Sequence, residues 1–341
     1  MSDSQAPSIA PLLSIVADGQ ALSRQQAREA MSALLSGETT PVQIAAFLLA
    51  LRVRGETVEE ITGLVEGMRE ASVRIDPARE GMVDLCGTGG DGSGTFNIST
   101  AAALVVAGCG VPVAKHGNRS ASSLCGSADV LEELGVPLDL EPEEARRMIE
   151  EEGFAFLFAQ KYHPAMRHVG PVRGELKLRT VFNILGPMTN PAGVKRQMIG
   201  VFDPAVRSTM CEVLGALGSE RVWALHGEGK LDELSIAGVT QVTELAGGSQ
   251  REFEVVPEDA GVQSSPLESL KGGDAAVNAG IIVQLLSGEE GPHRNAVVLN
   301  AAGALVVQGL AADLSEGGDR AREAIDSGAA QKVLGSLRQR S

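Results

Sequence analysis

The chain has 341 residues, a length that suits two domains or one large domain with a smaller one beside it. Its formal net charge of −15 argues against a general binder of nucleic acid or of anionic membranes, because both are negatively charged themselves. Aromatic residues make up only 3% of the sequence, so the core must be built mainly from Ala, Val, Leu and Ile.

The cysteines and the N-terminus indicate the compartment. Cys86, Cys109, Cys125 and Cys211 form no CxxC pair, so we expect reduced thiols rather than disulfides or a zinc site. The N-terminus has no basic segment followed by a long apolar one, which argues against a signal peptide. Because apolar runs elsewhere are too short for a membrane span, we expect a soluble cytoplasmic protein.

Residues 8–75 have the pattern of a compact group of helices. Ser23-x-x-Gln26 is a capping-box candidate that predicts one helix start, and Thr40-Pro41-x-Gln43 and Thr57-x-x-Glu60 predict two more. Apolar residues follow each start at helical spacing. No cluster of catalytic side chains stands out in this part, and residues 77–81 mark a boundary.

From residue 82 onward, short apolar runs of strand length alternate with helical segments. This alternation predicts an α/β fold with a largely parallel sheet and helices on both faces. The predicted strands are Met82–Cys86, Val111–Ala114, Phe154–Ala159, Gln197–Phe202 and Arg221–Leu225, with a hairpin at 239–256. The polar, proline-rich segment 163–191 does not fit the alternation, and we interpret it as an excursion that packs on the N-terminal helices.

A glycine-rich turn, Gly87–Thr95, follows the first predicted strand, and Asn97–Thr100 then begins an apolar helix. Glycines let backbone N–H groups come close to a ligand, and a helix N-terminus attracts phosphate. The turn matches neither the dinucleotide motif GxGxxG nor the P-loop motif GxxxxGK[ST]. A tight structural turn before an ordinary helix cap is the alternative interpretation.

A second polar segment follows the next predicted strand. Lys115–Arg119 supplies two cations, and Ser120–Ser127 is a loop of small and hydroxyl residues. Ligands bind at the carboxyl ends of strands in open α/β sheets, so we interpret this segment as the second wall of an anion site. A solvated surface run is the alternative.

Two further sets of residues could complete such a site. Asp232 and Glu233 follow a predicted strand and suit Mg²⁺ bound together with phosphate, although such a pair can be incidental in a chain with 44 acidic residues. Arg173 offers a planar match to a carboxylate, and His163 precedes it, although a single histidine is more often structural. Together these residues indicate a phosphate-rich ligand, a divalent cation and a carboxylated second substrate.

Six motifs, in this order, carry a closer resemblance. They are GTGGDGSGTFNIST (87–100), KHGNRSASS (115–123), GSAD (126–129), HPAMRHVGPVR (163–173), FNILGPMTNP (182–191) and LDE (231–233). Over nearly its whole length the chain resembles the anthranilate phosphoribosyltransferase family. The resemblance implies a small all-helical N-terminal domain, residues 1–78 together with 163–192, and a large α/β domain, the rest of 79–341, with a mainly parallel central sheet and a cleft between the two. It also implies a homodimer, with no nucleic-acid or membrane partner.

The resemblance further implies the ligands. The substrates would be 5-phosphoribosyl 1-pyrophosphate (PRPP) and anthranilate, and the cofactor Mg²⁺, with two ions per monomer and Ser99, Asp232 and Glu233 as ligands. The residues implied for PRPP are Gly87, Gly90, Asp91, Thr95, Asn97, Ile98, Ser99, Thr100, Lys115, His116, Gly117, Asn118, Arg119, Ser120, Ala121, Ser122, Ser123 and Ser127. Those implied for anthranilate are Gly87, Asn118, His163 and Arg173, with His116 as a neighbour.

In such an enzyme the amine of anthranilate displaces pyrophosphate from C1 of the ribose, giving N-(5-phosphoribosyl)anthranilate in tryptophan biosynthesis. Mg²⁺, Lys115 and the amides of the glycine-rich turn would stabilise the departing anion. The amine becomes acidic once it has attacked, so a strong protein base is unnecessary, and His116 is the one candidate for a catalytic base.

Two other functions fit parts of the sequence. A nucleoside phosphorylase shares the architecture but cleaves a base with phosphate; the LDE motif and the form of KHGNRSASS favour the transferase. A related protein that has lost the reaction and binds nucleic acid is the second, and the net charge of −15 argues against it. The departures from the family pattern, at Gly174, Lys177 and Glu228–Lys230, leave Arg173 and the acidic pair in place.

Overall fold

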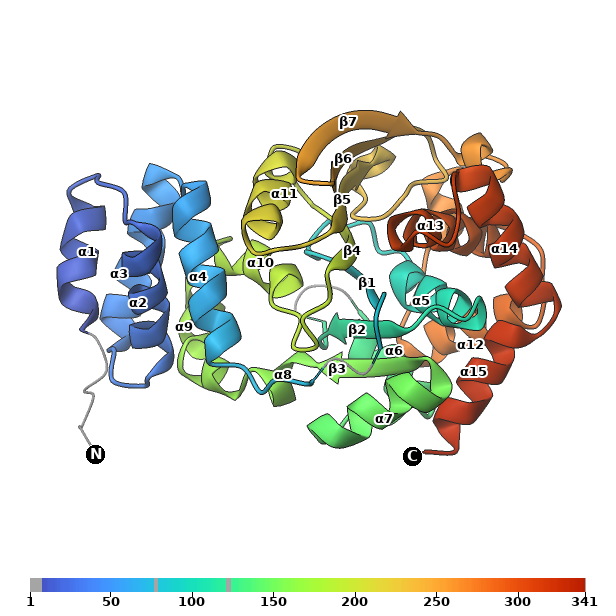
Figure 1. The fold of residues 1–341 in the computed structure, drawn as a ribbon, viewed down its shortest axis with the longest axis horizontal. Coiled ribbons are helices and arrows are strands. Elements are labelled where there is room, and N and C mark those ends of the chain that lie inside the picture. Colours follow the sequence, from blue (N-terminus) through green and yellow to red (C-terminus); the bar gives the residue numbers. More distant parts are fainter. Residues whose placement is uncertain (1–7, 77–78, 121–123, 341) are drawn as a thin grey trace.

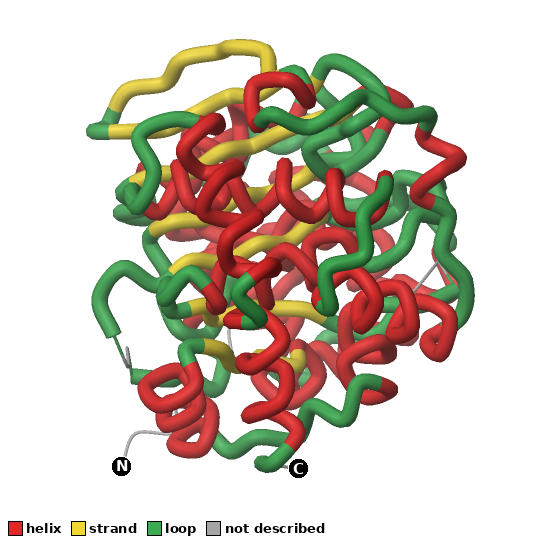
Figure 2. Tube along the Cα trace, turned by 90° about the vertical axis from the view of Figure 1, so that its right-hand side faces the viewer, coloured by secondary structure: helices red, strands yellow, loops and turns green. Residues whose placement is uncertain are grey.

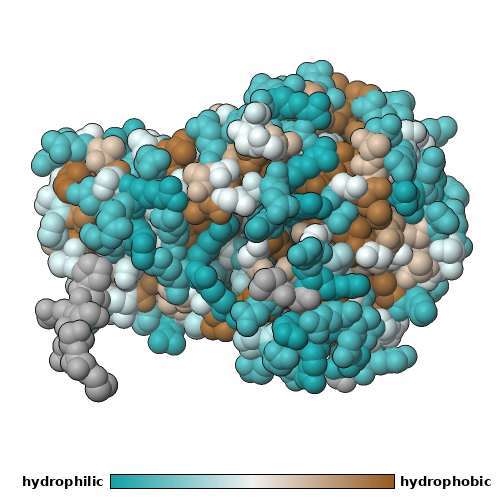
Figure 3. Space-filling view, in the orientation of Figure 1, coloured by the Kyte–Doolittle hydropathy of each residue, from teal (hydrophilic) through white to brown (hydrophobic). Residues whose placement is uncertain are grey.

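The structure is a computed structural model that describes residues 8–76, 79–120 and 124–340. Two parts lie side by side along the longest axis: a group of helices at the N-terminal end and a seven-stranded sheet covered by helices (Figure 1). Within the described ranges, no helix is both long enough and apolar enough to cross a membrane. The face seen in Figure 3 carries hydrophilic residues over both parts, with apolar residues scattered among them.

The first part contains α1 (Ile9–Ala17), α2 (Arg24–Leu35), α3 (Pro41–Arg54) and α4 (Val58–Glu70). Ser23, Thr40 and Thr57 form capping boxes at the starts of α2, α3 and α4, which confirms the predicted helix starts. Helices α2 and α4 approach so closely that a Cβ atom on Gly63 would lie 2.1 Å from the carbonyl oxygen of Arg24. A glycine is therefore required at this contact.

The segment between the third and fourth strands returns to these helices. It consists of α8 (Ala159–Tyr162), η1 (Pro164–His168), α9 (Gly170–Leu176), α10 (Phe182–Leu185) and η2 (Gly186–Met188). Helix α9 lies beside α3, and α10 lies beside α4 (Figure 1). Its buried Val169 and Phe182 belong to the same apolar cluster as Phe47 of α3. The segment thus leaves the sheet and packs on the N-terminal helices, as expected.

The strands of the sheet are arranged in the order β3-β2-β1-β4-β5-β6-β7. Neighbouring strands from β3 to β5 are parallel, whereas β5, β6 and β7 pair antiparallel. Figure 2 shows the strands crossing the molecule between layers of helices, so the mainly parallel α/β sheet is confirmed. The strands are β1 (Val83–Gly87), β2 (Val113–Gly117), β3 (Phe154–Phe158), β4 (Arg196–Gly200), β5 (Arg221–Gly227), β6 (Thr240–Ala246) and β7 (Ser249–Val255).

Alternating side chains of the strands pack against two different apolar clusters, as the two-residue period of a strand requires. Leu85 and Met198 join the cluster formed with α5 (Ile98–Gly108), α13 (Pro292–Gln308), α14 (Leu314–Asp326) and α15 (Ala329–Arg338). Cys86 and Ile199 join the cluster formed with α11 (Val206–Ala216) and the N-terminal helices. The remaining helices are α6 (Ser127–Glu133), α7 (Pro142–Glu152) and α12 (Ala275–Leu286), with single-turn η3 (Glu228–Lys230), η4 (Pro257–Ala260) and η5 (Leu267–Leu270).

One strand differs from its prediction in a way that matters for the site. The sequence predicts a strand at 111–114 with Lys115 and His116 beyond its end, whereas β2 spans Val113–Gly117. The apolar run misleads because pairing with β3 continues as far as Gly117 opposite Phe158. Lys115 and His116 are consequently strand residues held by the sheet.

Candidate active site

A cavity of about 640 Å³ lies where β1 ends and α5 begins. In the connecting loop, 88–97, four glycines have φ between 67° and 74°, a region that other residues rarely adopt. The far end of the loop is anchored by backbone hydrogen bonds, from the N–H of Phe96 to the oxygen of Leu270 and from the N–H of Gly272 to the oxygen of Gly94, each 3.0 Å long. The glycine loop is therefore a well-anchored segment that forms one wall of the cavity.

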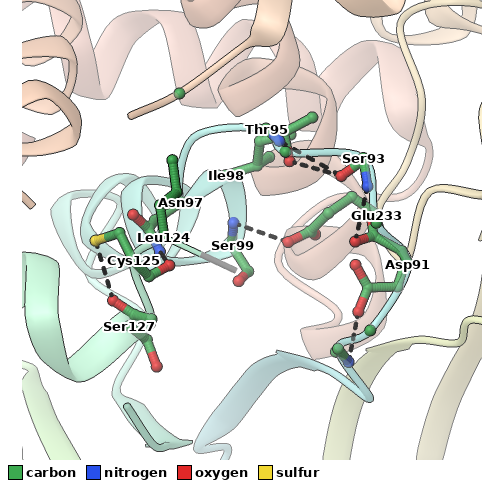
Figure 4. Close-up of a pocket in the computed structure, with 18 of the residues that line it drawn as sticks. Asp91, Ser93, Thr95, Asn97, Ile98, Ser99, Leu124, Cys125, Ser127 and Glu233 are labelled. Atoms are coloured by element: carbon green, nitrogen blue, oxygen red, sulfur yellow. Dashed lines mark hydrogen bonds between the residues drawn. The ribbon is translucent and has the colours of Figure 1, made fainter. Parts of the chain in front are cut away.

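Asp232 and Glu233 come to this loop from the segment after β5. Oδ2 of Asp232 accepts a hydrogen bond from the backbone N–H of Gly89 at 2.8 Å. Oε1 of Glu233 accepts one from the backbone N–H of Ser99 at 3.0 Å, and Figure 4 shows this bond across the cavity. Asp232 thus contacts the start of the glycine loop, and Glu233 contacts the helix that follows it.

The fit between Asp232 and β1 depends on Gly87. A Cβ atom at this position would lie 2.3 Å from Oδ2 of Asp232, closer than any real contact of this kind. The carboxylate of Asp232 can lie against the end of β1 in this way because residue 87 has no side chain.

The positive charge near Asp232 and Glu233 is not enough to keep both carboxyl groups ionised near pH 7. Burial and the nearby Asp91 raise the pKa of Asp232, and burial and Asp232 raise the pKa of Glu233 to about 8. Among the residues that the structure describes, no three His, Cys, Asp or Glu side chains come together as metal ligands. Two carboxylates with the hydroxyl of Ser99 nearby suit Mg²⁺, which usually keeps water and phosphate oxygens among its ligands.

Lys115 reaches the same region from inside the sheet. Its side chain is buried, and Nζ donates hydrogen bonds to the carbonyl oxygen of Leu85 at 2.5 Å and to Oγ of Ser99 at 3.3 Å. A positive charge is thereby held beneath the N-terminus of α5. An anion at the glycine loop would meet this charge together with the backbone N–H groups.

His116 and His163 face each other on the other side of the sheet, with ring centroids 5.1 Å apart. Neither Nε2 atom has a hydrogen-bond partner among the described residues. Burial, followed by the charge of His163, lowers the pKa of His116 to about 3, and burial lowers the pKa of His163 to about 4. Both rings are therefore neutral near pH 7, and a pKa this low makes His116 a weak base.

The remaining polar residues expected at the site have partners of their own. Arg119 pairs with Asp129 and Glu132, both at 2.8 Å, so its charge is already compensated. The guanidinium of Arg173 lies over the ring of Phe182, 5.2 Å from its centroid, and burial lowers its pKa.

The structure gathers one group of the expected residues at the cavity and leaves another group outside its lining. The expected residues that line it are Gly87, Gly90, Asp91, Thr95, Asn97, Ile98, Ser99, Thr100, Ser127, Asp232 and Glu233. Those outside the lining are Lys115, His116, Gly117, Asn118, Arg119, Ser120, His163 and Arg173. Ala121, Ser122 and Ser123 lie outside the described residues.

Sequence reasoning missed several residues that line the cavity, among them Arg179 and Asn278. Arg179, in the excursion, lies over the ring of Phe202 with a guanidinium-to-centroid distance of 3.8 Å and donates to the carbonyl oxygen of Gly90. Asn278, at the start of α12, donates to Oδ1 of Asn97 at 2.9 Å. Neither residue stands in a local motif, since the residue to which each donates a hydrogen bond lies about 90 or 180 positions away.

Comparison with known proteins gives the same assignment over both parts of the chain. Residues 10–72 match the helical bundle domain of the glycosyl transferase family, and residues 79–331 match its α/β domain. The anthranilate phosphoribosyltransferase of Azorhizobium caulinodans is 53% identical over 327 residues, which are 96% of this chain and 95% of the relative.

Two solved structures share the fold. The crystal structure of anthranilate phosphoribosyltransferase from Thermus thermophilus has a TM-score of 0.91 and 47% identity, covering 96% of this chain and 98% of that one. The enzyme from Saccharomyces cerevisiae, in complex with PRPP and Mg, has a TM-score of 0.89 and 28% identity, covering 98% of this chain and 99% of that one. Identity at this level over the full length shows that the chain belongs to the anthranilate phosphoribosyltransferase family.

Proposed function

We propose that this chain transfers the phosphoribosyl group of PRPP to the amine of anthranilate, giving N-(5-phosphoribosyl)anthranilate and pyrophosphate. This is the activity for which the family is named, and it belongs to tryptophan biosynthesis. The observation that carries the proposal is the convergence of the glycine loop and the Asp232–Glu233 pair around one cavity, with Lys115 behind its lining and bonded to Ser99. That combination suits a substrate with several phosphates.

We assign the glycine loop, residues 115–123 and Ser127 to PRPP. Backbone N–H groups of the loop and the N-terminus of α5 would hold the pyrophosphate, and Lys115 would add a full positive charge. Ser99, Asp232 and Glu233 would hold Mg²⁺, with two ions per monomer as the expected number. When bound, the metal supplies charge that stabilises the leaving pyrophosphate.

We assign anthranilate to the excursion side of the site, next to the cavity, since Gly87 lines the cavity whereas Asn118, His163 and Arg173 lie outside its lining. Arg173 would bind its carboxylate, and Gly87, Asn118 and the neutral His163 would border its ring. The amine nitrogen attacks C1 as the bond from C1 to the pyrophosphate oxygen breaks, and pyrophosphate leaves with the bonding electrons. Orientation of the two substrates then contributes much of the rate.

The domain limits remain our proposal: 1–78 with 163–192 as the small domain, and the rest of 79–341 as the large one. The contacts of α9 with α3 and of α10 with α4 support including the excursion in the small domain. We also propose a cytoplasmic protein, since Cys86, Cys109, Cys125 and Cys211, all in the described part of the chain, form no disulfide.

We propose a homodimer in which α3 packs against a second copy of the chain. Val42, Leu49 and Val53 are 78%, 43% and 79% exposed, and with Ala46 they form an apolar stripe on one face of the helix. Exposed apolar residues aligned in this way are unusual on a monomer. A twofold axis would place the stripe against itself, so the second copy is the matching occupant.

The direct test uses the fluorescence of anthranilate. Protein, PRPP and Mg²⁺ should remove the fluorescence, and EDTA should abolish the change. Retained fluorescence with folded, Mg²⁺-loaded protein would contradict the proposal. Release of a free base from a pyrimidine nucleoside and phosphate would instead favour a nucleoside phosphorylase.

A further inference from the structure

The two central strands β1 and β2 separate soon after they meet. Within the described chain they pair at one position, Val83 opposite Val113, whereas β1 pairs with β4 at five positions and β2 with β3 at five. Backbone groups of β2 that would face β1 therefore need other partners, because unpaired buried amides and carbonyls are costly.

Side chains fill this opening from both strands. Asp84 of β1 accepts a hydrogen bond from the backbone N–H of His116 at 3.2 Å. Lys115 of β2 reaches the other way and donates to the carbonyl oxygen of Leu85 at 2.5 Å. Each strand thus sends one charged side chain to the main chain of the other, on opposite faces of the sheet.

Asn190 completes the arrangement from the end of the excursion. Its Nδ2 donates to Oδ2 of Asp84 and to the carbonyl oxygen of Ala114, both at 2.8 Å, and its Oδ1 accepts from the N–H of Ala192 at 2.9 Å. Asp84 is fully buried, and Asn190 is 4% exposed. The amide uses both of its donors and its acceptor, so this is a fully satisfied buried network.

Asn190 also lies where the chain crosses between the N-terminal helices and the sheet. The oxygen of the adjoining Pro191 accepts a hydrogen bond from the N–H of Ile75 at 3.2 Å. The N–H of Val73 donates to the oxygen of Tyr162 at 2.9 Å. All three crossing segments, near residues 74, 162 and 190, are therefore linked beside the network.

We propose that Asp84 and Asn190 are a positioning pair that ties this crossing to β2, and so holds Lys115 and the turn after Gly117 in place for PRPP. The inference rests on the proposed function for the identity of the ligand. Neither residue touches the cavity, so they act through β2 rather than on the substrate. Displacement of β2 would move the ammonium of Lys115 away from Ser99 and the helix N-terminus.

The chain offers a matched control in Gln197 of β4. It is also buried, at 1% exposure, and its Nε2 donates to the oxygen of Pro187 in the excursion at 2.8 Å. Gln197 therefore ties the sheet to the same segment but makes no bond to β2. If these residues only stabilise the fold, substitution of either one should have the same effect. If Asn190 positions β2, only its substitution should impair PRPP binding.

The experiment compares Asn190→Ala, Asp84→Asn and Gln197→Ala in steady-state kinetics and thermal unfolding. Asn190→Ala should raise KM for PRPP about tenfold or more with little change in KM for anthranilate, because interactions that hold one substrate are lost. Gln197→Ala should lower Tm without this selective change. Equal KM changes in both variants, or a change in Tm alone for Asn190→Ala, would overturn the inference.

Asp84→Asn keeps the size of the side chain, and it provides the test if Asn190→Ala does not fold. Its amide replaces one of the two acceptor oxygens with a donor, so it loses either the hydrogen bond from Asn190 or the one from the N–H of His116, and either loss breaks the link between the crossing and β2. Hydrogen exchange at the amide of His116 gives a readout that needs no substrate: exchange should accelerate in Asp84→Asn and remain as in the wild type in Gln197→Ala. Unchanged exchange in Asp84→Asn overturns the inference, whereas absence of turnover by the wild type would contradict the proposed function alone.

Discussion

The carboxylate of Glu233 accepts a hydrogen bond from the backbone N–H of Ser99 at 3.0 Å, although the residues are 134 positions apart. The contact joins the segment after β5 to the N-terminus of α5. It places an acidic side chain at the helix N-terminus, where a bound anion or metal would be held, and it leaves the hydroxyl of Ser99 near Lys115. The geometry thus brings a proposed metal ligand and a proposed phosphate-binding cation to one residue.

Mg²⁺ should remove a pH-dependent loss of stability that Glu233 causes. Its pKa in the folded protein, about 8, lies above the ordinary value of 4.5. The stability that the protonated side chain of Glu233 contributes is therefore complete below pH 4.5 and is lost as the pH rises through 8. Between pH 4.5 and pH 8 the contribution of Glu233 to the free energy of unfolding should fall by about 1.4 kcal/mol per pH unit. Denaturation with EDTA at pH 5 and pH 8 measures it. Glu233→Gln should lose the part of the pH dependence that Glu233 causes and should respond less to Mg²⁺, whereas the part that comes from Asp232 remains. A slope equal to that of the wild type in this variant would refute the assignment.

Gly87→Ala should damage the site, because the added methyl group would collide with Oδ2 of Asp232. Overpacking of about 1–3 kcal/mol would lower kcat/KM roughly tenfold and raise the Mg²⁺ concentration needed for activity. Gly280→Ala on α12 is the control, since nothing lies within 4 Å of its Cβ position. Normal Mg²⁺ dependence in Gly87→Ala would argue against a metal at Asp232.

Arg173→Ala should mainly raise KM for anthranilate, because a charged partner of its carboxylate is lost. A hydrogen bond between charged groups contributes about 1.5–3 kcal/mol, which corresponds to a change of roughly tenfold or more. Steady-state kinetics with each substrate varied in turn provide the measurement. Arg167→Ala, at an exposed position of the same segment, is the control. A change limited to KM for PRPP would contradict the role of Arg173.

His116 should make the protein sensitive to acid. Its folded-state pKa of about 3 lies below the ordinary value of 6.5, so the stability it contributes is complete above pH 6.5 and is lost as the pH falls towards 3. The expected slope for this group is about 1.4 kcal/mol per pH unit. Between pH 7.5 and pH 5 the free energy of unfolding should fall less in His116→Asn than in the wild type. His168→Asn, at a partly exposed site, is the control, and an equal loss in His116→Asn would disprove the effect.

Val53→Glu should convert the proposed dimer to a monomer, since it places a charge in the apolar stripe of α3. Light scattering coupled to gel filtration gives the mass directly. Val283→Glu on α12, where the valine is 36% exposed, should leave the mass unchanged. A wild-type protein that is already monomeric at micromolar concentration would show that α3 does not mediate dimerisation.

The sequence by itself determined the features that depend on neighbouring residues. The helix starts after Ser23, Thr40 and Thr57, the hairpin within 239–256 and the glycine-rich turn are confirmed, because the chemistry of caps and turns acts within a few positions. The six motifs also carried the resemblance to the family, which the relatives confirm.

Only the tertiary structure decided which of these segments meet, because contacts between distant parts depend on strand order and packing rather than on local pattern. It extended β2 through Lys115, placed Glu233 on Ser99 and brought Arg179 and Asn278 to the cavity. It also joined Asp84 to Asn190, 106 positions away, where β1 and β2 part. A buried carboxylate in an apolar strand has no local signal for its partner, since that partner is chosen by the gap that the folded sheet leaves.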